Sequence, residues 1–450
     1  KKVRENMGVP LAIMLDTKGP EVRLGTFKNG KEELENGQEF TLTTENIIGD
    51  VHKVSITYKE LPKEVKLGTK ILIADGLIEL KVINMNDTDV ICQVVNGGTV
   101  GDRKNVNIPG ATSKLPAITE KDVSDLLFGI ENDVDFIAAS FIRKAADVLE
   151  IRKILESKKA MNIKIISKIE NQEGVDNSDE ILRVSDGLMV ARGDLGVEIP
   201  TEEIPFVQKD LIKKANKSGK PVITATQMLD SMIRNPRPTR AEVTDVANAI
   251  LDGTDAIMLS GETAAGKFPV DSVKTMSTIA KRTEMKYSYG KDLDTSLESN
   301  ITITNAISHA TCTTSIDLGA TAIITPTQTG TTARAVSKFR PKAPILAATP
   351  DEKICRTLNL CFGVYPMIVA PTDSTDALIE MSVNKALESD FVSGGDLVVI
   401  TAGVPVGVSG STNLIKVHIV GEILAKGMGI GNRAYVGKVC MIKNFKDDVA

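Results

Sequence analysis

The sequence predicts an α/β protein whose largest part is a TIM (β/α)8 barrel, and three observations support this prediction. Apolar runs each end in a charged or hydroxyl residue, and they alternate with amphipathic helical stretches, as parallel strands and helices do. One run precedes a long β-rich segment and five follow it, so we expect the first two strands of the barrel to be missing from this chain. The runs are Leu11–Leu15, Phe136–Ala139, Ile163–Ile166, Leu188–Ala191, Val222–Ile223 and Ala256–Leu259.

Length and charge narrow the class of protein. The 450 residues suggest two to four domains, since a domain usually has about 100–200 residues. Lys plus Arg number 54 against 59 Asp plus Glu, so no basic field favours nucleic acid and the expected partners are small molecules. Scattered cysteines without metal spacing favour a cytoplasmic protein, and no apolar run is long enough to predict a membrane span.

Period-two alternation between the first two barrel runs predicts a small inserted β-barrel domain, the β-rich cap, over residues 19–113. The barrel then comprises residues 1–18 and 114–290. The expected cap strands are Val22–Phe27, Phe40–Thr44, Lys53–Thr57, Ile71–Ile73, Leu77–Ile83 and Val90–Val94.

A second series of apolar runs predicts a C-terminal doubly wound α/β domain over residues 291–425. Its expected strands are Ala322–Thr325, Ile345–Ala348, Val364–Val369, Leu397–Thr401 and Val417–Val420. The texture changes again at residues 426–450, which we interpret as the start of a truncated extra C-terminal domain.

Charged residues at the ends of the predicted barrel strands point to a metal site. The strand period of two places Lys168 and Glu170 on the same side, and charge at inward positions is costly unless something there needs it. Asp194 follows the next strand, beside Gly193, whose backbone N–H a ligand could approach. The three histidines lie outside the barrel, so carboxylate oxygens favour Mg2+ or Mn2+ over zinc.

Hydroxyl groups add to this rim, although each also has a structural interpretation. Ser140 and Thr226 follow predicted strands, and Thr226 alone would be interpreted as a turn residue. The run Thr325–Thr332 ends a strand before a helix, where it could hold a phosphate or simply cap the helix. The residues by themselves indicate a metal-dependent enzyme that acts on a phosphorylated or enolisable acid.

Five segments, in the same order and spacing, resemble the signature segments of the pyruvate kinase family, and the resemblance runs from Lys1 to about Val420. They are Leu15–Arg23, Ile166–Asn171, Ala191–Glu198, Ala225–Leu229 and Leu259–Ala264. The resemblance implies a phosphotransferase that moves the phosphoryl group of phosphoenolpyruvate to ADP, giving pyruvate and ATP in the final step of glycolysis. It also implies allosteric activation and a homotetramer.

The resemblance implies specific roles for residues of this chain. Glu170 and Asp194 would hold Mg2+ or Mn2+, and Lys168 would stabilise the phosphoryl group during its transfer. The carboxylate end of phosphoenolpyruvate or pyruvate would be bound by Gly193, Asp194 and Thr226, with Ser140 nearby, and Thr226 would lie near where the enolate is protonated. Asp16 and Thr17 would contribute to a K+ site, and Arg23 and Lys104 would contact the nucleotide phosphates.

A phosphorylated effector is expected on the threonine-rich loop, at Thr327, Thr329, Gly330, Thr331 and Thr332, with Gly407–Asn413 closing near it. Two departures from the family pattern stand out: Asn105 occupies a position that is usually glycine, and the family's opening segment should precede Lys1. A Mg-dependent lyase of the pyruvate or oxaloacetate type and a catalytically impaired relic are the alternatives. The lyase would have no use for Arg23 and Lys104.

Overall fold

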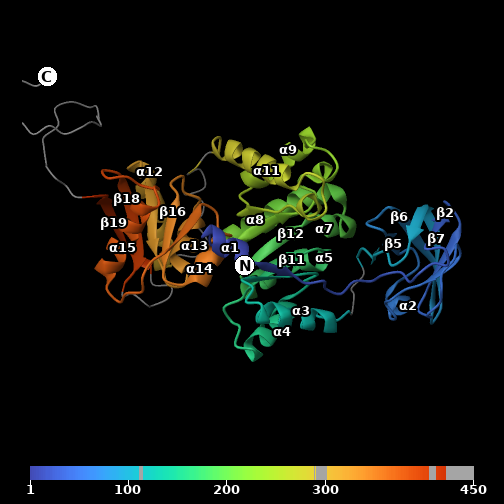
Figure 1. The fold of residues 1–450 in the computed structure, drawn as a ribbon. Helices are drawn as coiled ribbons and strands as arrows, with labels where there is room; N and C mark the ends of the chain where they lie inside the picture. The colour runs from blue at the N-terminus through green and yellow to red at the C-terminus, as the bar shows by residue number, and fades with distance from the viewer. Residues whose placement is uncertain (111–114, 288, 290–301, 405–411, 422–450) are drawn as a thin grey trace, which may run out of the picture.

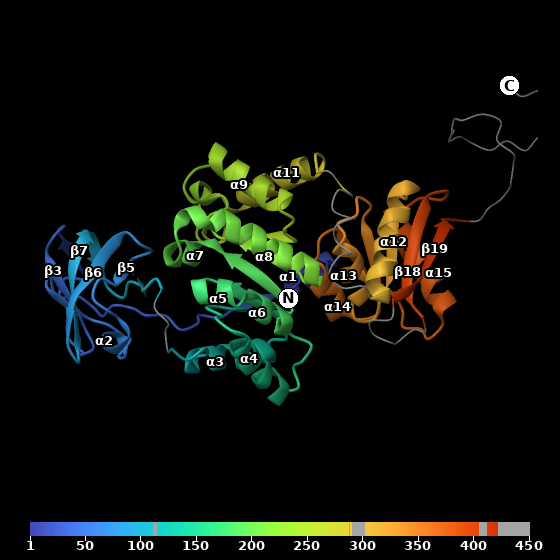
Figure 2. The same cartoon turned by 180° about the vertical axis from the view of Figure 1, so that it is seen from behind.

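The computed structural model describes residues 1–110, 115–287, 289, 302–404 and 412–421. Figure 1 shows a central parallel sheet with helices around it, the β-rich cap on one side and the C-terminal α/β part on the other, and Figure 2 shows the same order from behind. The chain leaves the central sheet after its first strand and returns to it for the second, so the cap is an insertion.

All six predicted barrel runs form strands, and within the described residues these strands make one parallel sheet in sequence order. The strands are β1 (Met14–Asp16), β10 (Phe136–Ala139), β11 (Lys164–Ile169), β12 (Gly187–Ala191), β13 (Val222–Ala225) and β14 (Ala256–Ile257). Strand β11 continues beyond its apolar run, so Lys168 lies on the strand itself.

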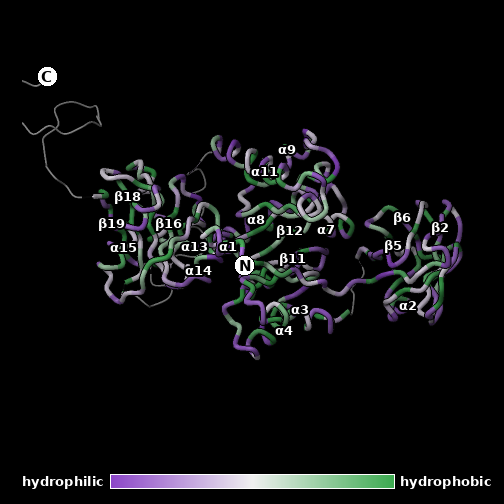
Figure 3. Tube along the Cα trace, in the orientation of Figure 1, coloured by the Kyte–Doolittle hydropathy of each residue, from purple (hydrophilic) through white to green (hydrophobic). Residues whose placement is uncertain are grey.

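Alternate residues of these strands lie in two separate cores. Ile165 and Ile169 of β11 pack toward the surrounding helices, whereas Ile166 packs with Met189 and Ile223 inside the curled sheet. Burial on both faces is typical of parallel sheets. Figure 3 shows the resulting concentration of hydrophobic residues along the central strands. Lys168 shares the period of Ile166 and therefore belongs to the inner side of the sheet.

Two of the helices around this sheet begin at a capping box: Thr119 and Asp122 form one on α3, and Thr239 and Glu242 form one on α9. The helices are α1 (Lys2–Met7), α3 (Glu120–Glu131), α4 (Ala145–Ser157), α5 (Gln172–Asp176), α6 (Ser178–Val184), α7 (Arg192–Glu198), α8 (Ile204–Ser218), α9 (Arg240–Leu251), α10 (Gly261–Ala264) and α11 (Pro269–Glu284), with 3-10 turns η1 (Thr201–Glu203) and η2 (Asp230–Ile233).

The β-rich cap contains one larger and one two-stranded sheet among the described residues, in the orders β4-β3-β7-β6-β5-β9 and β2-β8. Its elements are β2 (Lys31–Leu34), β3 (Glu39–Thr43), β4 (Lys53–Ser55), α2 (Leu61–Glu64), β5 (Lys70–Ile73), β6 (Ile78–Met85), β7 (Asp89–Asn96), β8 (Gly98–Gly101) and β9 (Val106–Asn107). The predicted strand Val22–Phe27 is wrong, because this segment makes only isolated bridges. Strand β2 was missed because only Leu34 of its four residues is buried.

The C-terminal part has the predicted doubly wound form, with separate cores on the two faces of its sheet. In the region described, the strand order is β17-β16-β15-β18-β19, with β19 antiparallel to β18. The elements are α12 (Ile303–Asp317), β15 (Ala322–Pro326), α13 (Thr331–Ser337), β16 (Ile345–Thr349), α14 (Glu352–Leu358), β17 (Val364–Ile368), α15 (Thr375–Glu388), β18 (Leu397–Gly403) and β19 (Thr412–Ile419). The predicted extra domain over residues 426–450 and most of the predicted loop Gly407–Asn413 lie outside the described residues.

A search of the described residues finds no helix that combines the length and the apolar character needed to span a membrane.

Candidate active site

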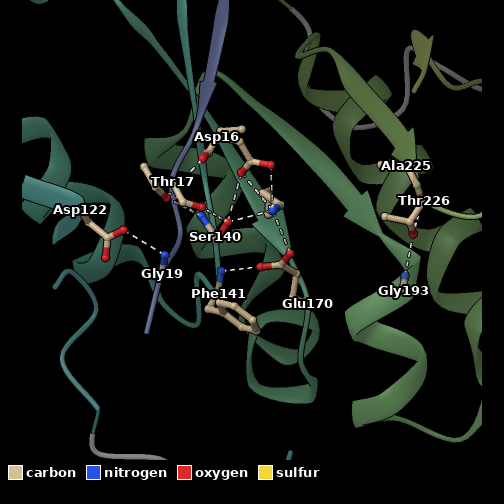
Figure 4. A network of polar contacts seen from close by, with 12 residues as sticks. Asp16, Thr17, Gly19, Asp122, Ser140, Phe141, Glu170, Gly193, Ala225 and Thr226 are labelled. Carbon is tan, nitrogen blue, oxygen red and sulfur yellow. Dashed lines mark hydrogen bonds and ion pairs between the residues drawn. The ribbon is translucent and has the colours of Figure 1, made fainter. Parts of the chain in front are cut away.

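The ammonium group of Lys168 lies at the centre of a polar cluster contributed by three neighbouring strands. Its Nζ donates to Oδ1 of Asp16 at 3.1 Å and to Oγ of Ser140 at 2.8 Å, and it lies 3.1 Å from Oε1 of Glu170. Figure 4 shows the side chains of Asp16, Ser140 and Glu170 converging at the ends of their strands. The fold therefore brings together four of the residues that the sequence singled out.

Burial and charge act on Lys168 in opposite directions. Burial lowers the pKa of Lys168, but the neighbouring carboxylates of Glu170 and Asp16 outweigh this effect and hold the pKa above its ordinary value. The side chain is only 13% exposed, so the ammonium keeps its charge in a position largely shielded from water. A fixed positive charge of this kind can stabilise negative charge that develops during a reaction.

Glu170 is a buried carboxylate without enough positive charge around it. Burial raises the pKa of Glu170 to about 7, because the contribution of Lys168 is partly cancelled by the negative charge of Asp194. The backbone N–H of Phe141 donates to its Oε2 at 2.5 Å. The pKa of Asp194 is also raised, mainly by burial, so both carboxyl groups carry an electrostatic cost when ionised together.

These two carboxylates fit a divalent cation that keeps part of its shell for substrate and water. Mg2+ is typically held by one or two carboxylates plus phosphate oxygens and water. A search of the residues that the structure describes finds no group of three or more His, Cys, Asp or Glu residues able to hold a metal. A closed all-protein site is therefore absent from that part of the chain. A cation between Glu170 and Asp194 would offset the burial of Glu170 and its repulsion by Asp194, which together raise its pKa.

Thr226 and Gly193 contact each other across the ends of two adjacent strands. The backbone N–H of Gly193 donates to Oγ1 of Thr226 at 2.6 Å, and this hydroxyl donates to the carbonyl of Ala225 at 2.7 Å. The N–H that the sequence offered to a ligand is thus already bonded to Thr226 in this structure. A Cβ atom at Gly193 would lie 3.4 Å from Thr226 Oγ1, so glycine leaves room for this contact.

Asp16 and Thr17 differ in solvent exposure and in hydrogen bonding. The hydroxyl of the buried Thr17 accepts from the N–H of Ser140 at 3.1 Å and lies 3.4 Å from the carbonyl of Ala138. The carbonyl of Thr17 accepts from Ser140 Oγ at 2.7 Å. Asp16 is 56% exposed at its side chain and is engaged by Lys168, so one of the two proposed potassium ligands is open and the other is tied into the backbone.

Arg23 and Lys104 lie in the cap, away from the Lys168 cluster. Nε of Arg23 donates to Glu21 Oε2 at 2.7 Å, which raises the pKa of Arg23, and Nη1 donates to the carbonyl of Arg103 at 2.8 Å. The side chain of Lys104 is exposed. The negative charge of Asp75, also in the cap, raises the pKa of both Arg23 and Asp194, so the cap presents charge toward the carboxylates of the barrel.

A cavity of about 380 Å3 lies where the cap meets the barrel, and Asp194 is among its lining residues. The side-chain amide of Asn107 on β9 donates to Glu198 on α7 at 2.8 Å beside it. At the two ends of the inserted segment, Gly19 and Gly110 have φ values of 71° and 75°, which a glycine adopts without steric cost. The cavity adjoins the proposed metal ligands from the cap side.

The threonine-rich loop forms internal hydrogen bonds rather than a helix cap. Thr327 Oγ1 accepts from the N–H of Gly330 at 3.0 Å, and Thr332 Oγ1 lies 2.9 Å from Thr412 Oγ1. Helix α13 begins after Gly330 without a side-chain capping bond, so the capping alternative is not realised. Thr329 and Thr331 share a hydrogen bond of 2.8 Å.

Two residues that act on Thr226 and Asp194 of the candidate active site are not among those predicted from the sequence. Arg192 binds the carbonyl groups of Ala225 and Thr226, and Asp75 acts on Asp194 from the cap. The sequence signal for Arg192 is a charged residue placed directly after a fully buried strand. Asp75 follows the apolar run of β5 in the same way, but only the folded chain shows that its charge reaches the barrel.

Comparison with known proteins agrees with this arrangement. The family model described as "Pyruvate kinase, barrel domain" matches residues 1–273, and the model described as "Pyruvate kinase, alpha/beta domain" matches residues 305–418.

Curated relatives and a solved structure match most of the chain. The chain is 53% identical to a pyruvate kinase of Bacillus licheniformis over 99% of its own length and 77% of the relative's. It is 57% identical to a pyruvate kinase of Clostridium acetobutylicum over 93% of its own length and 89% of the relative's. A crystal structure of a pyruvate kinase from Cryptosporidium parvum superposes with a TM-score of 0.88 at 41% identity, covering 93% of this chain and 86% of that one.

These relatives are named as kinases, so nothing in them supports the lyase alternative. The chain belongs to the pyruvate kinase family, whose metal-dependent phosphotransfer converts phosphoenolpyruvate and ADP to pyruvate and ATP.

Proposed function

We propose that the family's phosphoryl transfer takes place at the Lys168 cluster, with Lys168 stabilising the phosphoryl group as it moves. The observation that carries this proposal is the shielded ammonium group, held among Asp16, Ser140 and Glu170. Phosphoryl transfer depends mainly on positioning and on stabilisation of charge at the oxygens in transit. Because the Lys168 ammonium is already fixed in place, it does not have to reorganise when that negative charge develops.

Glu170 and Asp194 are proposed to hold Mg2+, or Mn2+ in its place. The bound cation would neutralise phosphate charge and polarise substrate oxygens. The chain contributes two carboxylates at fixed positions, because the Phe141 N–H orients Glu170 and the first turn of α7 carries Asp194. The raised pKa of Glu170 supports this assignment, because burial and the nearby negative charge of Asp194 together outweigh the effect of Lys168.

The carboxylate end of phosphoenolpyruvate or pyruvate is proposed to bind beside Gly193, Asp194 and Thr226, with Ser140 on the opposite side of Lys168. Thr226 keeps a hydroxyl proton at Oγ1, directed at the Ala225 carbonyl in this structure. The hydroxyl is therefore our candidate for the group beside the protonation step.

The nucleotide phosphates are proposed to contact Arg23 and Lys104 from the cap, across the cavity that adjoins Asp194. K+ is proposed to bind near Asp16, whose carboxylate is exposed, with an oxygen of Thr17. The permanently charged guanidinium of Arg23 is a suitable phosphate donor, although it must share its donors with Glu21.

We further assign the barrel to residues 1–18 and 114–290, the cap to 19–113 and the C-terminal domain to 291–425. A phosphorylated effector is proposed to bind at Thr327, Thr329, Gly330, Thr331 and Thr332, where hydroxyls gather ahead of α13. A homotetramer and a cytoplasmic location remain part of the proposal, and the latter is supported by the free, buried state of Cys92, Cys312, Cys355 and Cys361.

Turnover of phosphoenolpyruvate and ADP with Mg2+ tests the assignment through Lys168→Met. We expect turnover to fall by at least about 10³-fold, because the substitution removes the fixed charge and leaves the shape of the side chain similar. Lys164→Met is the matched control, since Lys164 lies at the other end of the same strand and pairs with Asp186 at 3.6 Å. It should keep turnover within about twofold of the parent.

Equal activity of the Lys168→Met and Lys164→Met proteins would contradict the role of Lys168. An unmodified chain that binds phosphoenolpyruvate but never phosphorylates ADP would instead support the impaired-relic alternative. Removal of divalent cations with a chelator should abolish turnover, and titration with Mg2+ should restore it.

A further inference from the structure

The backbone at the end of β13 has a conformation that its residues do not favour. Thr226 has φ 69° and Gln227 has φ 54°, so two successive residues with side chains occupy the left-handed region. For a β-branched residue such as threonine this conformation is a genuine outlier and carries an energetic cost. A strained turn of this kind persists only when its surroundings hold it in place.

The guanidinium of Arg192 is the group that holds this turn. Its Nη2 donates to the carbonyl of Thr226 at 2.7 Å, and its Nε donates to the carbonyl of Ala225 at 3.3 Å. Two successive carbonyls are therefore fixed by one planar group, in the region where the chain enters the left-handed conformation. Nη2 also contacts the sulfur of Met228.

The guanidinium is itself fixed from its other side. Nη1 donates to Oδ1 of Asp245 on α9 at 2.6 Å and lies 3.4 Å from Oε1 of Gln208 on α8. The side chain of Arg192 is 10% exposed. Arginine suits this place because its planar fork can bind carbonyl and carboxylate oxygens at once, which a lysine ammonium cannot do with the same geometry.

The consequence reaches the proposed substrate site directly. Arg192 immediately precedes Gly193, and the N–H of Gly193 donates to the Thr226 hydroxyl at 2.6 Å (Figure 4). One side chain thus ties the start of α7, which carries Asp194, to the end of β13, which carries Thr226. A shift of either segment would move the hydroxyl relative to Gly193 and Asp194.

We propose that Arg192 is a positioning residue of the active site: its guanidinium fixes the left-handed backbone of Thr226 and Gln227 and thereby sets the Thr226 hydroxyl against Gly193. This inference rests on the proposed role of Thr226 in the reaction. It assigns to Arg192 no contact with substrate, only control of the residues that make such contacts.

The first test is Arg192→Lys, which keeps the positive charge but loses the fork that binds both carbonyls. We expect kcat to fall about 10- to 100-fold, because misplacement of a reacting group by about 1 Å has effects of this size. KM for ADP should stay within about twofold, because Arg192 lies away from the cap residues proposed for the nucleotide.

The matched control is Arg152→Lys. Arg152 is also a largely buried arginine, with Nη2 donating to Asp186 at 2.8 Å and to a backbone carbonyl at 3.4 Å, but it lies at the opposite end of the sheet. It should lower thermal stability to a similar extent while kcat stays within about twofold of the parent. Equal losses of kcat in the two variants would reduce Arg192 to a structural residue and overturn the proposal.

Rescue provides a readout that general destabilisation would not produce. Glycine adopts positive φ without steric cost, so Gln227→Gly should relieve the strain that Arg192 otherwise holds. In the Arg192→Lys background, Gln227→Gly is expected to recover kcat at least about threefold. Failure to recover any activity would contradict the strained turn as the route by which Arg192 acts.

A crystal structure of the Arg192→Lys protein decides the question without any assay of turnover. The expected result is loss of the 2.6 Å contact between the Gly193 N–H and Thr226 Oγ1, with Thr226 leaving the left-handed region. Retention of both would overturn the proposal. If the unmodified chain shows no turnover, that result counts against the proposed function, whereas this structure still tests Arg192.

Discussion

Both ends of the central sheet carry buried or half-buried carboxylates, but each carboxylate at the amino end pairs with its own arginine, whereas the two at the carboxyl end have one lysine between them. At the amino end, Asp135, Asp186 and Asp255 each precede a strand and accept a backbone N–H at the start of the neighbouring strand, from Ile13, Ile165 and Val222 respectively. Each also pairs with an arginine: Arg356, Arg152 and Arg340 respectively.

At the carboxyl end, burial outweighs the nearby positive charge in its effect on the carboxyl pKa values. Glu170 and Asp194 share the single ammonium of Lys168 as the cation acting on both, and burial raises the pKa of each carboxyl group. At the amino end the pKa of Asp186 is lowered, because Lys164, Arg152 and the N–H of Ile165 together outweigh its burial. The same residue type therefore stabilises the fold at one end and leaves charge available for a cation at the other.

The largest expected effect concerns the amino end, through Arg356→Met. Arg356 on α14 joins the C-terminal part to the buried Asp135 of the barrel, with Nε donating to Oδ1 at 2.8 Å. Loss of one partner of a buried ion pair costs about 3–5 kcal/mol, because the other charge stays buried. The midpoint of thermal denaturation, followed by circular dichroism, should fall accordingly.

Lys353→Met is the control for Arg356. Lys353 lies on the same helix and pairs with Asp133, which is 57% exposed, so its loss should cost less than about 1 kcal/mol. If both variants unfolded at the same temperature, burial of the pair would not be what distinguishes this end of the sheet.

The second-largest expected effect is a gain in stability, and it concerns Glu170 at the carboxyl end of the sheet. In the absence of divalent cations, Glu170→Gln should stabilise the protein by about 1–3 kcal/mol near pH 8, because it removes a buried charge. The pKa of Glu170 is about 7 in the folded chain and thus above its ordinary value, so the parent loses stability as the pH rises through that range. The difference between variant and parent should therefore shrink toward pH 5.

Mg2+ provides the complementary measurement on the same pair of proteins. The cation should raise the melting temperature of the parent and leave that of the Glu170→Gln variant nearly unchanged. A variant less stable than the parent at every pH would show that Glu170 supports the fold in the way that the amino-end aspartates do.

The smallest effect tests the pH dependence at the amino end with Asp186→Asn. The lowered pKa of Asp186 means that its ionised form contributes stability that is present above its ordinary pKa and lost as the pH falls through the folded pKa. The variant should be about 1 kcal/mol less stable at pH 7 because the side chain is 27% exposed and partly screened. Urea denaturation should show this difference shrinking as the pH falls below the ordinary pKa of aspartate, and a constant difference would contradict the linkage.

Much of the fold could be predicted because its signals are local. All six barrel runs became strands, in the order in which they occur in the sequence. The cap was harder, since Lys31–Leu34 reads as a charged stretch and Gly98–Gly101 as a turn, yet the two segments pair as antiparallel strands. Pairing between distant segments overrides weak local preference when one side chain in four is buried.

The candidate site was predictable to the same degree. Lys168 and Glu170 lie two residues apart on one strand, so their common face follows from the sequence alone. The sequence predicted that Lys168, Asp16 and Ser140 lie at the same rim of the barrel, but it did not predict the contacts between them. The role that we propose for Arg192 could not be predicted, because its partners Ala225, Thr226 and Asp245 lie on other elements.

The sequence by itself determined which residues stand at the ends of the strands and which face of a strand they occupy. These properties depend on backbone periodicity over a few residues. Only the tertiary structure decided which carboxylates have an arginine of their own and which share one lysine, and that Asp75 of the cap acts on Asp194 of the barrel. Charge interactions depend on distance and burial in space, and packing sets both between residues that are far apart in the chain.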